Sequence, residues 1–118
     1  MKHMFLRNAC RCLLTKLRLI PKPTYILRLD RRQPNAAQLS SREIVAVMGA
    51  AEPKWVCLLC PCGSGEVVRL ALRPHYGPTW SLQVDLVGRP TLNPSIWQRE
   101  GCLCHFWIRK GEISFHMA

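Results

Sequence analysis

The first clear hydrophobic pattern along the chain is a helical stripe near the N-terminus. Apolar residues recur there at steps of three and four, and most basic residues lie off the stripe. The stripe consists of Phe5, Leu6, Cys10, Leu13, Leu14, Leu17 and Ile20. This spacing predicts a basic amphipathic helix over residues 4–20, which Pro21 and Pro23 would end. Such a helix packs on its own domain, extends from it as a frayed segment, or docks on a partner or an anionic surface.

Beyond residue 23 the pattern changes to short alternating or β-branched runs. Strands are predicted at residues 25–29, 44–48, 54–59, 66–72, 80–87, 106–108 and 113–115. Polar, glycine- and proline-containing segments separate them, notably residues 31–41, 73–79 and 88–90. Many short strands with turn signals between them are typical of an antiparallel β domain. We therefore predict a mainly β fold, with a small antiparallel β domain over residues 24–118 and a basic helix or leader over residues 1–23.

Charge is distributed unevenly along the 118 residues, whose formal net charge is +10. Residues 1–32 hold nine Lys and Arg against one Asp, whereas residues 33–118 hold eight against six acids. The basic character thus belongs to the N-terminal segment, which weakens the case for a nucleic-acid-binding domain. No run of eighteen apolar residues exists, so no membrane span is expected, and basic residues interrupt any signal-peptide core. We expect a cytoplasmic protein.

Two close-set cysteine clusters carry the clearest chemical signal. Cys60-Pro61-Cys62-Gly63 and Cys102-Leu103-Cys104-His105 lie about forty residues apart. Tetrahedral Zn²⁺ takes four such soft ligands, and the odd count of seven cysteines argues against a disulfide framework. The glycine after Cys62 would let the backbone turn tightly. The pattern predicts a structural zinc site that joins the tip of a hairpin over residues 54–72 to a C-terminal turn.

The number of candidate ligands exceeds what zinc needs. The candidates are Cys57, Cys60, Cys62, Cys102, Cys104 and His105. Because zinc needs four, at least two are bystanders. Strand alternation places Cys57 on the face opposite Cys60 and Cys62, which favours a core thiol there.

Three spaced motifs carry a family resemblance. They are the CPCG turn at residues 60–63, the run TLNPSIW at residues 91–97, and GCLCHF at residues 101–106. Over roughly residues 40–115 the chain resembles a bacterial family of small zinc-binding proteins with the motifs CPCGCG, TLxPS(I/V)W and GCxSHF. Members of that family lie beside genes for ubiquitin-like modifiers and their E1- and E2-type enzymes. The resemblance implies that the modifier or those enzymes are partners.

Two positions depart from the family motifs. Ser64 stands where the family has the third cysteine of CPCGCG, and Cys104 stands where it has the serine of GCxSHF. One change removes a thiol and the other adds one, which indicates compensation within a single site. We therefore expect Cys60, Cys62, Cys102 and Cys104 to bind Zn²⁺, with Cys57 and His105 as alternates.

A second candidate site pairs Ser95 with His105. A serine and a histidine close together in the fold are the minimal parts of a nucleophile and its general base. Asp85 or Glu100 would then orient the imidazole, while His75 and His116 are weaker candidate bases. If His105 is a base it cannot also bind zinc, so the two roles compete. The simpler interpretation is that the Ser95 hydroxyl caps a turn.

Two classes of function follow from these sites. One is a zinc-stabilised serine protease or isopeptidase that processes or removes a ubiquitin-like modifier. The alternative is a non-catalytic zinc-ribbon-like adaptor that binds a protein partner or, with less support, nucleic acid. A catalytic zinc with an open position, served by Glu66 as acid and base, is a third and weaker option.

Overall fold

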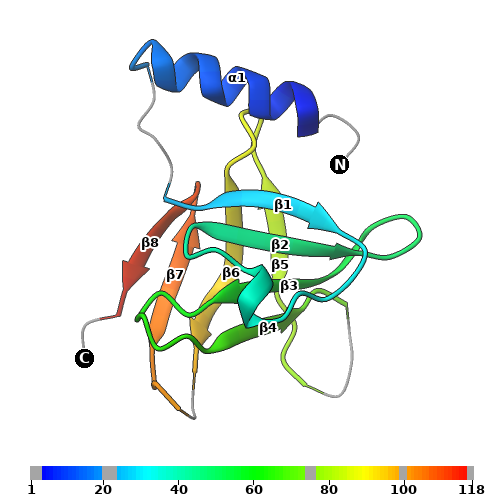
Figure 1. Ribbon diagram of the computed structural model, residues 1–118, viewed down its shortest axis with the longest axis vertical. Coiled ribbons are helices and arrows are strands. Elements are labelled where there is room, and N and C mark those ends of the chain that lie inside the picture. The colour runs from blue at the N-terminus through cyan, green and yellow to red at the C-terminus, as the bar shows by residue number, and fades with distance from the viewer. Residues whose placement is uncertain (1–3, 20–23, 74–76, 99–100, 117–118) are drawn as a thin grey trace.

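The computed structural model describes residues 4–19, 24–73, 77–98 and 101–116, which form a helix and two four-stranded sheets (Figure 1). The helix is α1, Met4–Lys16. The first sheet contains β1 (Ile26–Asp30), β2 (Glu43–Met48), β3 (Pro53–Leu59) and β4 (Val67–Ala71), with the short 3₁₀ helix η1 (Ala36–Gln38) between β1 and β2. The second contains β5 (Ser81–Val84), β6 (Pro90–Trp97), β7 (His105–Arg109) and β8 (Glu112–Phe115). The prediction of a mainly β fold with an N-terminal helix is confirmed.

The strands of each sheet follow one another in chain order, and all pairs are antiparallel except one. The exception is β1, which runs parallel to β2 with Ile26 opposite Glu43. The loop over residues 31–42 carries the chain back across the sheet and so permits the parallel pairing. The expectation of a purely antiparallel domain was therefore wrong at this edge.

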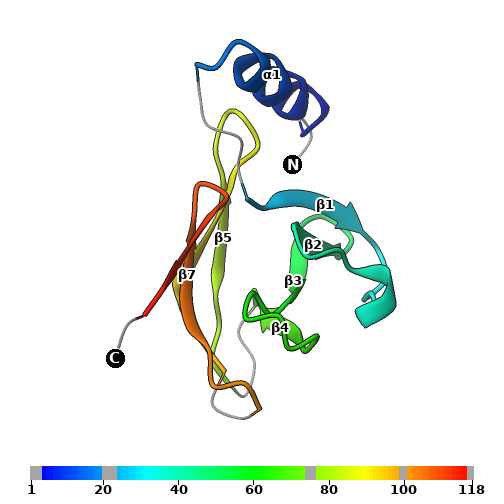
Figure 2. The same cartoon turned by 60° about the vertical axis from the view of Figure 1, so that its left-hand side comes forward.

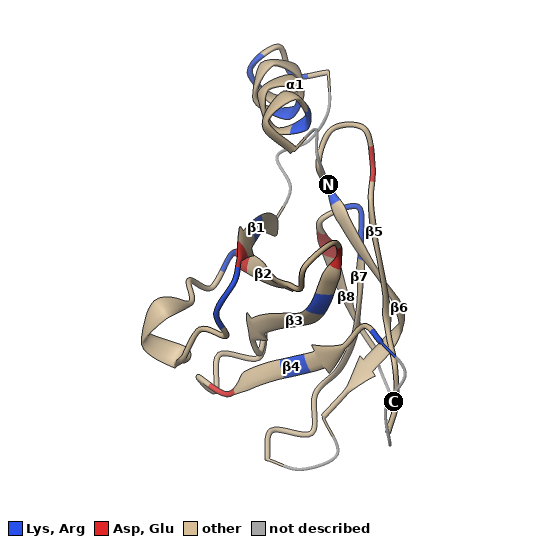
Figure 3. Ribbon diagram, turned by 90° about the vertical axis from the view of Figure 1, so that its right-hand side faces the viewer, with Lys and Arg blue, Asp and Glu red and all other residues tan. Residues whose placement is uncertain are grey.

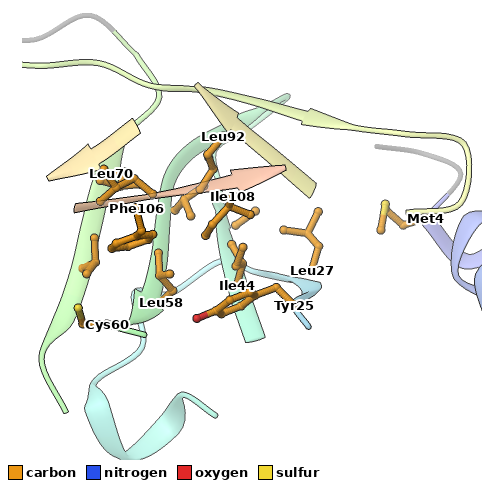
Figure 4. Packing of buried hydrophobic residues seen from close by; sticks show 14 residues of the cluster. Met4, Tyr25, Leu27, Ile44, Leu58, Cys60, Leu70, Leu92, Phe106 and Ile108 are labelled. Atoms are coloured by element: carbon orange, nitrogen blue, oxygen red, sulfur yellow. The ribbon is translucent and has the colours of Figure 1, made fainter. Parts of the chain in front are cut away.

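The main core lies between the two sheets, which face each other at an angle (Figure 2). Leu58 and Leu70 of the first sheet and Phe106 and Ile108 of the second belong to one buried cluster, with Cys60 at its edge (Figure 4). A smaller cluster on the other face of the first sheet contains Leu39, Val45, Val47 and Cys57. Strand β2 is buried along both faces because it contributes to both clusters.

Strand β6 is an element that the sequence pattern did not predict. Residues 88–90 were expected to turn the chain, and the turn does extend through Gly88 to Arg89. Ser95 was also expected to lie in a turn, but it lies in Pro90–Trp97, the longest strand described. Pro90 is tolerated because it is the first residue of the strand. Pro94 is tolerated because the pairing with β7 is interrupted between Leu92 and Ile96. The two prolines therefore argued against a strand in the sequence, although the pairing of β6 does not require an N–H group at either position.

Helix α1 covers the turn between β5 and β6 (Figure 1). The Nη1 atoms of Arg7 and Arg11 lie 3.3 Å from the Val84 carbonyl oxygen and 3.4 Å from the Gly88 carbonyl oxygen. Met4 and Arg11 are its only buried residues, whereas most of its apolar stripe is exposed. The helix thus packs on the domain through Met4 and its polar face, which the periodicity of the stripe did not reveal.

Candidate active site and metal site

Ser95 lies in the irregular part of β6. Leu92 pairs with Ile108 and Ile96 pairs with Phe106, so three residues of β6 lie opposite the single residue Trp107 of β7. The peptide bond between Asn93 and Pro94 within this segment is cis. Extra residues in one strand of a pair redirect side chains relative to the regular pleat, and Ser95 lies among these extra residues.

The Oγ atom of Ser95 lies 2.8 Å from Nε2 of His105, the first residue of β7. Both side chains are partly exposed and line a surface hollow of about 470 Å³. The hollow is lined by Pro78, Trp80, Pro94, Ser95, Trp97 and His105. The indole N–H of Trp80 also donates a hydrogen bond of 3.3 Å to the backbone carbonyl of Ser95. A hydroxyl and an imidazole in this contact, open to solvent, can act as a nucleophile and its base.

Aromatic rings hold the His105 imidazole from several sides. It stacks on Trp97 with centroids 5.2 Å apart and on Trp107 with centroids 5.1 Å apart. The ring of His116 lies 4.7 Å from it in a tilted arrangement. These rings share the outer face of the second sheet because Phe106 and Ile108, which alternate with His105 and Trp107, face the core.

The expectation that Asp85 orients His105 is wrong. Asp85 lies in the turn beneath α1, where its carboxylate accepts hydrogen bonds from the Arg89 backbone and side chain and from the Val87 N–H. Burial raises the pKa of Asp85, but these bonds and the Arg89 charge outweigh it and hold the pKa below its usual value. Among the ion pairs of the described residues none involves His105, and Glu100 and His75 lie outside those residues.

Four cysteine sulfurs converge where the β3–β4 turn meets the β6–β7 loop. The Sγ atoms of Cys60, Cys62, Cys102 and Cys104 all lie within 4.8 Å of one another. A tetrahedral Zn²⁺ with Zn–S bonds of about 2.3 Å would hold its sulfurs about 3.8 Å apart, so the described set fits such an ion. Among the described residues the group contains neither Cys57, which is fully buried in the smaller core cluster, nor His105.

Tight turns bring the first cysteine pair into place. Gly63 and Gly65 have φ angles of 83° and 80°, a region that residues with a Cβ rarely adopt. The N–H of Gly63 donates to the Cys60 carbonyl over 3.3 Å, and the N–H of Cys60 donates to the Glu66 carbonyl over 2.8 Å. The CPCG segment therefore does lie at the tip of a hairpin, as predicted.

The thiols of Cys60, Cys62 and Cys104 differ in their readiness to ionise. A hydrogen bond with Ser64 lowers the pKa of Cys62 to about 6. Burial raises the pKa of Cys60 and brings that of Cys104 to about 11. The lowered pKa favours the thiolate form of the exposed Cys62, which is the form of sulfur that binds metal.

Sequence reasoning brought Ser95 and His105 together but missed the rings around the imidazole. The sequence did contain a signal for these rings: Trp97 is two residues from Ser95 and Trp107 is two residues from His105, and residues two apart in a strand share a face. That alternation could be used only once residues 90–97 were known to form a strand.

The fold and the two sites define a small β protein with a serine–histidine pair beside a four-cysteine cluster. Over residues 30–116 the chain matches the family described as bacterial ubiquitination-like system serine protease, BubE, and it belongs to that family. It is therefore a component of a bacterial ubiquitination-like system, and the family's name describes a serine protease.

Searches of curated proteins and of solved structures found no match. None of the helices in the described part of the chain is long and apolar enough to cross a membrane.

Proposed function

We propose that the protein is a serine protease or isopeptidase that processes or removes the ubiquitin-like modifier of its own system. The observation that carries this proposal is the 2.8 Å contact between Ser95 Oγ and His105 Nε2 in an open hollow. The family to which the chain belongs supports the proposal by its name. In this role Ser95 is the nucleophile and His105 the general base.

The reaction begins with the transfer of the hydroxyl proton of Ser95 to His105. Nε2 of His105 accepts the proton of Ser95 Oγ as the oxygen attacks the carbonyl carbon of the scissile amide. The imidazolium then gives that proton to the leaving amine, and an ester between Ser95 and the modifier remains. Water, deprotonated by the same imidazole, hydrolyses the ester and restores the serine.

The surrounding rings serve to position the base. Stacking between Trp97 and Trp107 restricts rotation of the His105 ring, a task that a carboxylate performs in other serine proteases. The hydrogen bond from Trp80 to the Ser95 carbonyl fixes the backbone of the nucleophile. Trp80 and Trp97, with Pro78 and Pro94, give the hollow apolar walls, against which an extended modifier tail would lie.

We also propose that Cys60, Cys62, Cys102 and Cys104 bind one structural Zn²⁺. A closed set of four thiolates is typical of structural rather than catalytic zinc, so this proposal assigns Glu66 no catalytic task. When bound, the ion supplies a cross-link between the β3–β4 turn and the loop before β7. Reduced thiols are needed for it, which supports the proposal that the protein is cytoplasmic.

A cleavage assay tests the proposal. The substrate is the system's modifier carrying a C-terminal extension, and the enzymes are wild type, Ser95→Ala and the matched control Ser114→Ala. Ser114 is an exposed serine of β8 in the same sheet. Wild type and Ser114→Ala should release the extension at equal rates, and Ser95→Ala should be slower by about three orders of magnitude or more.

Equal cleavage by Ser95→Ala and wild type would contradict the proposed nucleophile. If wild type cleaves neither the extension nor an isopeptide-linked conjugate, and instead binds the modifier or its E1- or E2-type enzyme, the adaptor alternative holds.

A further inference from the structure

The outer face of α1 is apolar although it faces away from the domain. Leu6, Cys10, Leu13 and Leu17 follow one another at steps of four, three and four, so they lie along one side of the helix. Leu6, Leu13 and Leu17 are 61%, 58% and 57% exposed, and the adjoining Phe5 is 84% exposed. We call these five residues the outer stripe of α1.

The opposite side of the helix is the one that the domain holds. Arg11 is only 6% exposed, and its guanidinium contacts Asn8 Oδ1 at 2.8 Å as well as the Gly88 carbonyl. Apart from Met4, which packs in the main core cluster, the helix engages its polar side and exposes its apolar side, the reverse of the orientation usual in a globular domain. Exposed apolar area of this extent indicates a surface that something else covers.

The charge at this end of the molecule indicates what covers it. Residues 4–19 contain Arg7, Arg11, Lys16 and Arg18 and no acidic residue (Figure 3). The acid in the turn beneath, Asp85, is neutralised by Arg89 at 2.7 Å. Because a helix is about 10 Å across, even the arginines on its domain side lie within about one Debye length of a surface that touches the outer stripe.

We propose that the outer stripe of α1 inserts into the interface of an anionic lipid bilayer, so that the protein binds membranes peripherally. The outer stripe has no side chain that would fix the orientation of a partner protein through strong hydrogen bonds, as a specific protein interface requires. A lipid surface requires only apolar area and positive charge, both of which α1 presents. Two copies of this chain meeting through the stripe would bring helices of like charge together, which disfavours self-association.

This orientation keeps the catalytic pair accessible. Gly88 lies against α1, and β6 runs from there toward Ser95, so the Ser95–His105 pair and the cysteine cluster lie at the end of the domain remote from the helix (Figure 1). A domain resting on lipid through α1 would present its hollow to the aqueous phase. The inference is independent of the chemistry proposed for that hollow.

Vesicle flotation with the full chain tests the inference. The vesicles are phosphatidylcholine with or without phosphatidylglycerol, and the variants are Leu13→Gln/Leu17→Gln and the control Leu29→Gln. Glutamine keeps helix propensity and charge, and Leu29 is an exposed leucine of β1 outside the outer stripe. Wild type and Leu29→Gln should float only with vesicles that contain phosphatidylglycerol, and added salt should weaken their binding. The double variant should bind these vesicles at least ten-fold more weakly than wild type.

Three results would overturn the inference. The first is that wild type does not float with the vesicles, and the second is that the double variant floats as well as wild type. The third is that light scattering shows wild type and Leu29→Gln to be dimers and the double variant to be a monomer. Cleavage of the modifier substrate in solution by the double variant should equal that of wild type, which separates this test from that of the proposed function.

Discussion

Cys104 and His105 are neighbours in the chain, yet their side chains belong to two different sites. The sulfur of Cys104 lies within 4.8 Å of the three other cysteine sulfurs, whereas Nε2 of His105 lies 2.8 Å from the Ser95 hydroxyl. Adjacent residues at the start of a strand point to opposite faces, so one backbone segment serves both sites. Whatever holds Cys104 in place therefore also holds His105.

The first prediction concerns metal. Replacing Cys104 by serine should lower zinc from one ion per chain to a small fraction of that and lower the melting temperature on the order of 10 °C, because a structural ion contributes folding free energy. Cleavage should fall with the zinc content, since the start of β7 loses its anchor. Elemental analysis and thermal unfolding measure this, with Cys57→Ala as the control that keeps its zinc. Unchanged zinc in Cys104→Ser would contradict the proposed ligand set.

Trp107 should act on catalysis through His105. Its ring stacks on the imidazole but does not line the hollow, so Trp107→Ala should lower kcat about ten-fold and leave KM unchanged. Trp107→Phe keeps an aromatic face and should restore most of the rate. Steady-state kinetics on the modifier substrate distinguish the two variants. A rise in KM with kcat preserved would mean that Trp107 binds substrate instead.

Asp85 should contribute stability but no catalysis. Asp85→Asn should leave kcat/KM unchanged and lower the free energy of unfolding at neutral pH by roughly 1 kcal/mol, through the weakened bonds to Arg89. The pKa of the folded-state carboxyl is lowered, so its contribution is fully present above the unfolded pKa of about 3.9 and is lost as pH falls from there through the lower folded-state pKa. Denaturant unfolding of both proteins from pH 7 to pH 3 should show the difference shrink in acid. A large loss of activity in Asp85→Asn would contradict this prediction and indicate that Asp85 takes part in catalysis.

The contact between α1 and the β5–β6 turn can be tested at Gly88. Its φ angle is 79°, and a Cβ there would lie 2.9 Å from Asn8 Oδ1 and 3.0 Å from Arg11 Nη1. Gly88→Ala should cost about 1–2 kcal/mol of stability and expose α1 to proteolysis. Gly65→Ala is the matched control, because Gly65 has a φ of 80° with open space around it. Equal protease resistance of α1 in both variants would mean that α1 does not rest on Gly88.

The hydrophobic pattern and the turn residues of the sequence predicted those strands and turns that depend on residues close together in the chain. Alternation marked the strands around Leu70, Leu82 and Ile108, and the glycines after Cys62 marked the hairpin tip. The pattern missed β6, because Pro90 and Pro94 normally exclude a strand and only long-range pairing shows that neither N–H is needed there. The orientation of α1 was equally invisible, since an apolar stripe does not say whether its own domain covers it.

The same limit applied to the candidate sites. The spacing of the cysteines indicated a shared site, and Cys57 was assigned to the core from alternation alone. The pairing of Ser95 with His105 was a hypothesis from their residue types, whereas the aromatic contacts of His105 needed the register of β6 and β7. Asp85 was nominated by sequence proximity, yet β6 carries the chain away from it before Ser95 is reached.

The most direct test of the central claim, that His105 activates Ser95, needs no knowledge of the substrate. Wild type, His105→Gln and Ser114→Ala are treated with a fluorophosphonate, which labels only activated serines, and the adduct is located by mass spectrometry. We predict an adduct on Ser95 in wild type and in Ser114→Ala, and none in His105→Gln under the same conditions. An unlabelled Ser95 in zinc-loaded wild type, or equal labelling in His105→Gln, would contradict the assignment of this pair as the catalytic centre.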